Sequence, residues 1–522
     1  MPGATVNPFH DPILARCQSI LFAHFESDDG WIGIDLASLL TRAGQFAALY
    51  EAFGIGPRDT VLVILQPGLD PHAAFLGAML IGAIPSFMPY PNTKQDDDIY
   101  WRQHRAIFHA LRPKAVLTFA DIRNPIETAC AGLETTVLSQ GAADALAPLA
   151  QWNIPPPDAI AFIQYSSGTT GLKKGVPISY AALASHIHAY QAALRLDKIA
   201  QPIIATWLPL YHDMGLITCF LMPLLLGVPI ISVDPFEWTM RPGAFLAAVG
   251  AFRATHLWLP NFALLHHANR AGSLNHLDLS AVEAIICCSE PCKPAAFDAF
   301  HARFAAAGLR PAALQTCYAM AETVFAVTQS PIGIPPRRLL MPDGQELLSN
   351  GPPIAGCTLK ILDDGEICVQ APWLFAGYQN DPTPLHDGYF RTGDLGFLEG
   401  GELFIRGRIK DVIIINGRNI FAHDVEAAVA AHAAVRPGRV VAFGLFDDAQ
   451  GSERLIVVAE TNNPASITEI NRIVLSTLGV PCHDIRLVAP GWLIKTTSGK
   501  LSRSENAQKY ANQFHLTGNP VQ

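Results

Sequence analysis

The chain has 522 residues, of which 50% are hydrophobic and 16% charged. This length corresponds to about 3.5 domain-sized units, and the composition is too apolar for extensive disorder. The net charge of −9 argues against a protein that mainly binds the phosphate backbone of DNA or RNA. We therefore expect no nucleic-acid partner.

The ten cysteines are scattered through apolar stretches without regular paired spacing. This pattern favours reduced thiols in a cytoplasmic protein over a disulfide framework. The N-terminus lacks a charged start followed by an apolar core, so we expect no signal peptide. The most apolar run, residues 219–233, contains Pro223, Gly227 and Pro229. It is too short and too interrupted to span a bilayer, and it predicts a buried helix followed by a buried strand.

Short β-branched runs alternate with longer amphipathic runs through the first two-thirds of the chain. The first predicted strand is residues 61–66, a helical pattern follows at 71–83, and the next strand is 114–119. Four later strands, each placed before a helix-like segment, are predicted at residues 159–165, 229–233, 255–259 and 282–288. This alternation is typical of βα units around mostly parallel sheets.

The pattern changes after about Gly351. Four short strands separated mainly by turns predict an antiparallel meander or small barrel-like subdomain at residues 358–362, 366–370, 402–405 and 412–415. A compact α/β pattern then closes the chain, with helices at 424–435 and 466–479 around strands at 439–444 and 454–460. We place a domain boundary near 406–410, which gives a large domain over 1–406 and a small one over 407–522. Net charge changes there, from −11 over the first 407 residues to +2 from residue 408 onward.

Residues 165–175, YSSGTTGLKKG, follow a predicted buried strand and precede a helix that begins near Ser179. Glycines allow the backbone to approach an anion closely, and hydroxyls and backbone N–H groups donate to phosphate oxygens. A plain flexible turn is the alternative interpretation. The segment does not match the Walker A pattern.

This segment resembles the phosphate-loop motif of the superfamily of acyl-CoA synthetases, peptide-synthetase adenylation domains and luciferases. Further motifs of that superfamily follow in order: LPLYHDMGLI (208–217), CSEP (288–291), YAMAE (318–322), RTGD (391–394), GRIKDVIIINGRN (407–419) and TTSGK (496–500). Within it, the resemblance is closest to fatty-acyl-AMP ligases. It implies an α/β fold: a large N-terminal domain of βα sheets, a small β-barrel-like subdomain and a small mobile C-terminal domain.

The resemblance implies that the enzyme joins a carboxylic acid, in this branch a fatty acid, to AMP and then passes the acyl group to a thiol. ATP and Mg²⁺ are the expected cofactors, and Glu322 and Thr170 are the expected metal ligands. The residues implied to bind the triphosphate are Ser167, Gly168, Thr169, Thr170, Gly171 and Lys174. Those implied at adenine and ribose are Ser289, Glu290, Pro291, Tyr318, Ala319, Met320, Thr323, Asp394 and Arg408.

Three further roles are implied by the motifs. Lys500 matches the catalytic lysine that bridges the substrate carboxylate and the α-phosphate, where a cation offsets crowded negative charge. His212 is implied in catalysis beside the acyl pocket, and Lys410 is implied as the hinge of the small domain. The residues expected at the acyl pocket are Trp207, Trp258, Asn261, Phe262 and Cys317.

Simpler interpretations exist for single residues: a solvated carboxylate at Glu322, a core tyrosine at Tyr318, an Asx turn at Asp394 and surface lysines at Lys410 and Lys500. The expected acceptor is the phosphopantetheine thiol of an acyl carrier protein. The alternatives are coenzyme A, or a non-enzymatic acyl- or nucleotide-binding relic. Only 28 residues separate Glu322 from Gly351, so a segment that such ligases carry near here, and that is associated with refusing coenzyme A, is shortened or missing.

Overall fold

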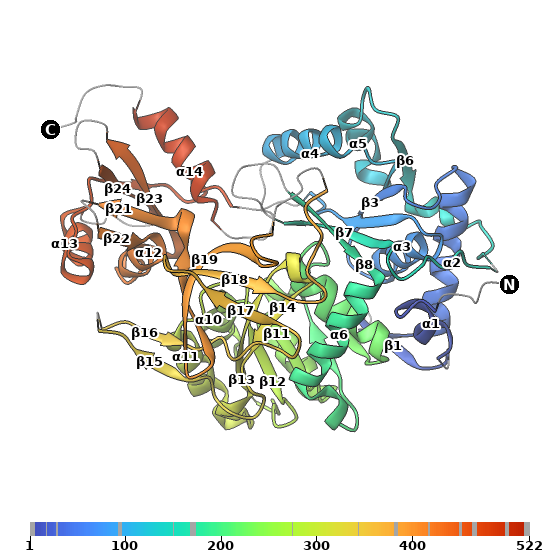
Figure 1. Ribbon diagram of the computed structural model, residues 1–522, viewed down its shortest axis with the longest axis horizontal. Helices are drawn as coiled ribbons and strands as arrows, with labels where there is room; N and C mark the ends of the chain where they lie inside the picture. The colour runs from blue at the N-terminus through green and yellow to red at the C-terminus, as the bar shows by residue number, and fades with distance from the viewer. Residues whose placement is uncertain are drawn as a thin grey trace.

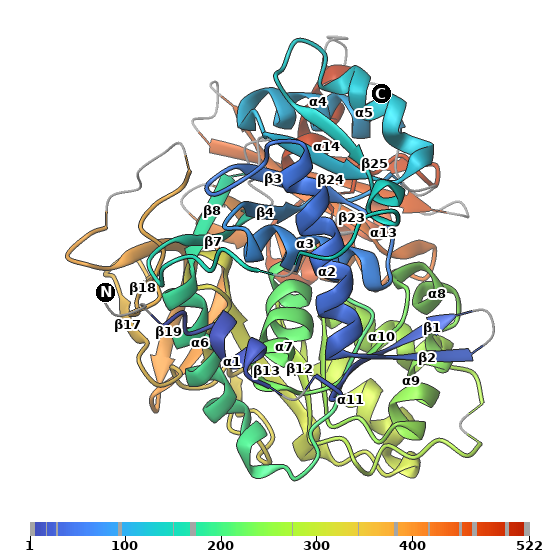
Figure 2. The same cartoon turned by 90° about the vertical axis from the view of Figure 1, so that its right-hand side faces the viewer.

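The computed structural model shows a large body with a smaller C-terminal part at one end (Figures 1 and 2). It describes residues 6–16, 18–27, 30–91, 97–149, 151–166, 174–273, 275–342, 344–379, 385–415, 418–447, 452–461, 467–495 and 501–515. The body contains two larger sheets, a β meander and two two-stranded sheets, and the C-terminal part contains a three-stranded sheet and a two-stranded hairpin. This architecture confirms the predicted α/β fold.

An eight-stranded sheet forms the centre of the body, in the order β14-β13-β12-β11-β9-β10-β1-β2. Its strands are β1 (Leu21–Ser27), β2 (Gly30–Asp35), β9 (Ile204–Thr206), β10 (Ile230–Ser232), β11 (His256–Leu259), β12 (Ala284–Cys287), β13 (Leu314–Ala319) and β14 (Ala326–Gln329). Neighbours run parallel except at the two edges, where β2 and β14 are antiparallel. The prediction of a mostly parallel sheet is confirmed.

A second, fully parallel sheet has the order β4-β3-β5-β6. Its strands are β3 (Thr60–Ile64), β4 (Ile84–Phe87), β5 (Ala115–Thr118) and β6 (Thr136–Ser139). Alternate residues of β3 face opposite sides, as the pleat requires. Val61 and Val63 pack with α2 (Leu36–Ala52) and α3 (Leu69–Leu80), while Leu62 and Ile64 pack with α4 (Asp97–Leu111) and α5 (Arg123–Ala129). Helices therefore cover both faces of the sheet, which explains why residues 61–64 of β3 are all apolar.

The segment around the predicted phosphate loop differs from expectation. Strand β7 (Ile160–Ser166) is followed by an antiparallel partner, β8 (Lys174–Ser179), before α6 (Tyr180–Leu194) begins. We expected the loop to lead directly into the helix, so β8 is a correction. The predicted start of the helix is confirmed, because the Ser179 side chain caps it by accepting from the backbone N–H of Ala182.

The remaining helices of the body pack around the eight-stranded sheet. They are α1 (His10–Leu14), α7 (Met222–Leu226), α8 (Pro235–Met240), α9 (Pro242–Ala251), α10 (Asn261–Arg270) and α11 (Pro294–Phe304). A buried π-helix, Met214–Leu221, runs into α7 and is followed by β10. This confirms the helix-then-strand prediction for residues 219–233. Within the described ranges, no helix combines the length and hydropathy needed to cross a bilayer.

An antiparallel meander is present, as predicted, with four strands in chain order, β17-β18-β19-β20. Its strands are β17 (Thr358–Ile361), β18 (Glu366–Gln370), β19 (Phe390–Glu399) and β20 (Glu402–Arg408). Two details differ from the prediction: the third strand, residues 390–399, was not expected, and the strand expected at 412–415 pairs outside this sheet, with residues 418–421. A small apolar cluster that includes Tyr318 of β13, Ile367 and Leu403 joins it to the large sheet. The short hairpin β15 (Arg338–Leu340) and β16 (Glu346–Leu348) lies between Glu322 and Gly351.

The C-terminal part has its own cores. It consists of the hairpin β21 (Val412–Ile415) and β22 (Arg418–Phe421), the sheet β23 (Val435–Asp447), β24 (Ser452–Thr461) and β25 (Asp484–Val488), and the helices α12 (Ala422–Ala430), α13 (Ile467–Leu478) and α14 (Arg503–Tyr510). In β24, Leu455 and Val457 face the core with α12 and α13, while Ile456 and Val458 face the core with α14. The nine cysteines within the described ranges are free thiols.

Candidate active site

Tyr318, Asp394 and Arg408 come together where the large sheet meets the meander. Asp394 of β19 and Arg408 of β20 are opposite each other in the antiparallel ladder, so their side chains share one face. Oδ2 of Asp394 accepts a 2.6 Å hydrogen bond from the Tyr318 hydroxyl, and Oδ1 accepts one of 2.9 Å from Nε of Arg408. The structure therefore unites three residues that were predicted at adenine and ribose.

The charges in this group reinforce one another. Burial, together with the charge of Asp394, raises the pKa of Tyr318 well above its usual range, so its hydroxyl remains a donor. The Asp394 carboxylate raises the pKa of Arg408. The Asp394 side chain is 10% exposed and that of Arg408 is 59% exposed. An anchored carboxylate therefore lies beside a cation that solvent or a ligand can reach.

Glu322 is held by a tight local fold. It lies in a 3₁₀ turn (Ala321–Thr323) followed by Val324, whose φ of 66° is unusual for a β-branched residue. The backbone oxygen of Glu322 accepts from the N–H of Phe375 at 2.9 Å, and its Oε1 accepts from the Tyr378 hydroxyl at 2.7 Å. Burial raises the pKa of the Glu322 carboxyl, and the hydrogen bond from Tyr378 opposes this.

The predicted aromatic/His motif lies next to Glu322. Asp213, which follows His212, is close enough that its charge contributes to raising the pKa of Glu322, after the larger effect of burial. The Cys288 thiol, just before the predicted adenine segment, contacts Sδ of Met214 at 3.1 Å. The carboxylates of Asp213 and Glu322 thus lie in a common region. The described residues contain no group of three or more His, Cys, Asp or Glu side chains arranged to hold a metal.

Residues 289–291, the predicted adenine segment, are tied to the start of α10. Ser289 has a φ of 67°, which marks a tight bend after β12. Oε2 of Glu290 accepts from the backbone N–H of Phe262 at 3.1 Å, and Oδ1 of Asn261 accepts from the N–H of Lys293 at 2.9 Å. Asn261 and Phe262 therefore position this segment.

The predicted phosphate loop is described only at its ends. Ser167, Gly168, Thr169, Thr170 and Gly171 lie outside the described residues, as does Lys500. Lys174 is described, and its Nζ lies 4.5 Å from the centre of the Tyr378 ring. The next residue, Gly175, accepts from the backbone N–H of Gln379 at 2.9 Å.

An apolar cavity opens where strands of the two parallel sheets end. Its lining includes one residue just after the carboxyl end of each of β3, β4, β9 and β10, namely Leu65, Met88, Leu208 and Val233. His72 and Tyr211 complete this part of the wall. Ligands of parallel α/β sheets bind at such carboxyl ends. Part of the aromatic/His motif lines the cavity, because Leu208 and Tyr211 belong to that motif and Tyr211 precedes His212.

None of the five residues predicted at the acyl pocket lines this cavity. Trp207 instead stacks on Trp238, with ring centres 3.5 Å apart, and Phe262 packs edge-on against Trp207. Trp258 and Cys317 lie in the core around Tyr190, whose hydroxyl accepts from Nε1 of Trp258 at 3.1 Å. The structure thus divides these residues between two aromatic clusters and the start of α10.

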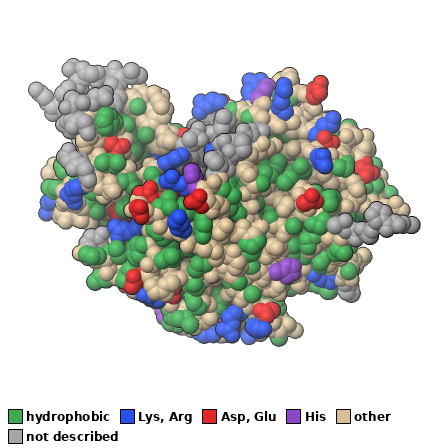
Figure 3. All heavy atoms as spheres, in the orientation of Figure 1, with side chains coloured by type: hydrophobic (Ala, Val, Ile, Leu, Met, Phe, Trp, Pro, Cys, Tyr) green, Lys and Arg blue, Asp and Glu red, His purple; other side chains and the backbone are tan. Residues whose placement is uncertain are grey.

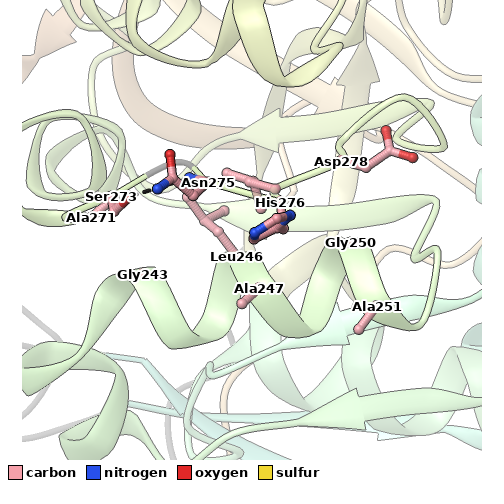
Figure 4. Close-up of a pocket in the computed structure, with 11 residues that line it drawn as sticks. Gly243, Leu246, Ala247, Gly250, Ala251, Ala271, Ser273, Asn275, His276 and Asp278 are labelled. Atoms are coloured by element: carbon pink, nitrogen blue, oxygen red, sulfur yellow. Dashed lines mark hydrogen bonds between the residues drawn. The ribbon is translucent and has the colours of Figure 1, made fainter.

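A separate hollow lies between α9 and the residues 271–273 and 275–278 (Figure 4). Its lining includes His276 and Asp278, and a 3.2 Å hydrogen bond joins the Asn275 backbone N–H to Ser273 Oγ. Among the predicted active-site residues that the structure describes, none lines it.

The C-terminal part contacts the body through polar side chains. Oδ1 of Asp424 in α12 accepts from Nε2 of Gln345 at 2.8 Å and pairs with Nζ of Lys293 at 3.6 Å. Glu505 of α14 accepts from Gln103 of α4 at 2.9 Å. Figure 3 shows charged and His side chains gathered where the two parts meet. The predicted hinge residue, Lys410, lies exposed in a 3₁₀ turn (Ile409–Asp411) that links β20 to β21.

Sequence reasoning missed two residues at the site: Asp213, whose charge acts on Glu322, and Tyr378, which contacts Glu322 and Lys174. Asp213 could have been found, because it directly follows His212 in a recognised motif. Tyr378 gave no comparable signal, because its contacts with Lys174 and Glu322 join segments distant in sequence.

Comparison with known proteins finds a matching family and similar chains. The family described as AMP-binding enzyme matches residues 22–379. The medium-chain-fatty-acid–[acyl-carrier-protein] ligase JamA of Moorena producens is 30% identical over 87% of this chain and 86% of its own length. The long-chain-fatty-acid–AMP ligase FadD23 of Mycobacterium tuberculosis is 28% identical over 89% of both. A solved structure from a study of fatty acyl-adenylate ligases of E. coli and L. pneumophila has a TM-score of 0.90 at 23% identity over 99% of both chains.

Proposed function

Because this chain belongs to the AMP-binding enzyme family, we propose that it activates a fatty acid as acyl-AMP and then transfers the acyl group to an acyl carrier protein. A carboxylate oxygen attacks the α-phosphorus of ATP, and the bond to the bridging oxygen breaks with release of pyrophosphate. A phosphopantetheine thiol then attacks the acyl carbonyl, loses its proton to solvent and displaces AMP. The observation that supports this most is the joining of Tyr318, Asp394 and Arg408, from three separate motifs, at one carboxylate.

The proposed nucleotide site follows from this group. Tyr318 stacks on adenine opposite Ser289, Glu290 and Pro291, and Ala319, Met320 and Thr323 border the same site. Asp394 accepts from the ribose hydroxyls, with Arg408 donating beside it. Lys174 acts with the hydroxyls of Ser167, Thr169 and Thr170 on the β- and γ-phosphates. Lys500 neutralises charge at the reacting carboxylate and α-phosphate.

The residues present fit a magnesium ion. Mg²⁺ is typically bound by one or two carboxylates together with phosphate oxygens and water. Glu322 is such a ligand, and the nearby charge of Asp213 makes the region more negative, which favours a cation. We propose Glu322 as the protein ligand, with the Thr170 hydroxyl as a second. When bound, the ion offsets triphosphate charge during displacement.

We propose that the alkyl chain occupies the cavity at the strand ends. Its lining is mostly apolar and adjoins His212 through Tyr211, so an acid bound there places its carboxylate toward the predicted nucleotide site. The residues that the sequence placed at the acyl pocket do not line this cavity, so we propose that they affect the acyl chain only through the packing around it. Trp207 lies between the lining residues Thr206 and Leu208 in the chain, so its stack on Trp238 holds this stretch of the cavity wall in place.

The acceptor is proposed as a carrier protein, because the relative JamA is named as an acyl-carrier-protein ligase. We further propose that the part following β20 rotates about Lys410 between the two half-reactions, since it has its own cores. Coenzyme A is the competing acceptor. Related ligases carry an extra segment that is associated with rejecting coenzyme A, and this chain has only the short hairpin β15–β16 in that region.

Pyrophosphate exchange tests the first half-reaction. With ATP, Mg²⁺ and a panel of carboxylic acids of increasing chain length, we expect fatty-acid-dependent incorporation of labelled pyrophosphate into ATP. Absence of exchange across the whole panel would contradict adenylation and favour a binding relic. For the second half-reaction, mass spectrometry after offering holo-carrier protein and coenzyme A together should show the acylated carrier. If acyl-CoA forms and the carrier stays unmodified, the proposal that a carrier protein is the acceptor is overturned.

A further inference from the structure

A short segment, residues 375–379, connects the exit of the phosphate loop with Glu322. At one end, the Phe375 N–H donates to the backbone oxygen of Glu322 at 2.9 Å. At the other, the Gln379 N–H donates to the backbone oxygen of Gly175 at 2.9 Å. The side chain of Gln379 also accepts from the Tyr165 hydroxyl of β7 at 3.1 Å. The segment therefore spans two parts of the proposed triphosphate site.

Tyr378 contacts a functional group on each side. Its hydroxyl donates to Oε1 of Glu322 at 2.7 Å, and its ring centre lies 4.5 Å from Nζ of Lys174. The edge-on ring of Phe375 holds the Tyr378 ring, with centres 4.9 Å apart. One rigid aromatic side chain thus fixes a carboxylate through a hydrogen bond and an ammonium through a cation–π contact.

We propose that Tyr378 is a positioning residue for the triphosphate. It holds Glu322 and Lys174 at a fixed separation before ATP binds. The inference rests on the proposed function, because it assigns these two residues to the metal and phosphates of ATP. A bond from the hydroxyl restricts rotation of the carboxylate. The ring face restricts the ammonium of a flexible side chain, and so lowers the entropy lost when a phosphate binds.

This role separates ATP from AMP. Both nucleotides contain adenine, ribose and an α-phosphate, whereas only ATP has the β- and γ-phosphates that Glu322 and Lys174 serve. Loss of the Tyr378 hydroxyl should therefore weaken ATP binding and leave AMP binding unchanged. A purely structural role would weaken both, because the segment would then support the fold of the whole site.

The variants separate the two contacts. Tyr378→Phe keeps the ring above Lys174 and removes only the bond to Glu322. Tyr378→Leu removes both. Tyr510→Phe is the matched control, because the Tyr510 hydroxyl also donates to a carboxylate, Asp484, at 2.6 Å, but within the C-terminal part. Thermal melting establishes that each variant is folded, and if the leucine variant fails to fold, the phenylalanine variant alone carries the test.

Isothermal titration calorimetry of the full chain, in magnesium buffer without fatty acid, measures the affinities for ATP and AMP. We expect Tyr378→Phe to weaken ATP binding about tenfold, Tyr378→Leu to weaken it further, and AMP binding to stay at the wild-type value in both. Tyr510→Phe should match the wild type for both nucleotides. If Tyr378→Phe binds ATP as tightly as the wild type, or loses AMP affinity equally, the inference is overturned. A wild-type protein that binds neither nucleotide would instead overturn the proposed function.

Discussion

The Tyr318 hydroxyl donates a 2.6 Å hydrogen bond to Asp394, which lies 76 residues further along the chain. The bond joins β13 of the large parallel sheet to β19 of the antiparallel meander. Since Arg408 binds the other carboxylate oxygen, the orientation of Asp394 is determined before any ligand arrives. Preorganisation of this kind lowers the cost of ordering a site on binding.

Asp394→Asn tests the proposed ribose contact. The amide keeps the size of the side chain but loses the charge, and hydrogen bonds to charged groups contribute about 1.5–3 kcal/mol. We therefore expect ATP and AMP affinities to fall together, by about 10- to 150-fold, because both nucleotides contain the ribose. Asp484→Asn, which disturbs the similar pair with Tyr510, is the control. Unchanged affinity for both nucleotides in Asp394→Asn would remove the ribose role.

Lys500→Ala tests the proposed catalytic lysine. A cation at the α-phosphate stabilises charge that develops only during adenylation, so we expect acyl-AMP formation to slow by about 10²–10³-fold. Thiol transfer from preformed acyl-AMP should be spared. The two half-reactions are measured separately, by pyrophosphate exchange and by carrier acylation from synthetic acyl-AMP. An equal loss in both would contradict the assignment.

Lys410→Pro tests the proposed hinge. Proline fixes φ near −65° and so hinders a large backbone rotation. We expect thiol transfer to fall by roughly 10- to 100-fold, with adenylation less affected, because the second half-reaction depends on the rotated pose. Lys410→Ala removes the charge but keeps backbone freedom, and should transfer normally. Normal transfer in the proline variant would place the hinge elsewhere.

The buried histidines predict sensitivity to acid. Burial lowers the pKa of His186 from 6.5 to about 3, and its Nε2 accepts from the backbone N–H of Ala326 at 2.9 Å. At a pH between these two pKa values, His186 is protonated in the unfolded chain and neutral in the folded chain. The free energy of unfolding therefore falls as pH decreases, by about 1.4 kcal/mol per pH unit for this group. His186→Gln, measured by denaturant unfolding from pH 7 to pH 5, should show a correspondingly shallower dependence. An unchanged slope would show that His186 does not titrate in this way.

Local patterns predicted most of the fold because they report local physics. The apolar run at residues 61–66 indicated a buried strand, and β3 is covered by helices on both faces. Strand β8 was missed because Lys174, Gly175 and Pro177 lack a strand-like apolar alternation. Its pairing comes instead from β7, through a ladder that the local sequence does not encode.

The sequence by itself indicated the motif residues, the alternation of strand and helix, and a change of pattern and charge toward the C-terminus. These depend on residue type and on spacings of two to four residues, which act within one element. Only the tertiary structure decided that Tyr318 meets Asp394, that Tyr378 lies between Lys174 and Glu322, and that Trp258 belongs to the core. Such contacts depend on how distant segments cross, and therefore on the packing of the whole chain.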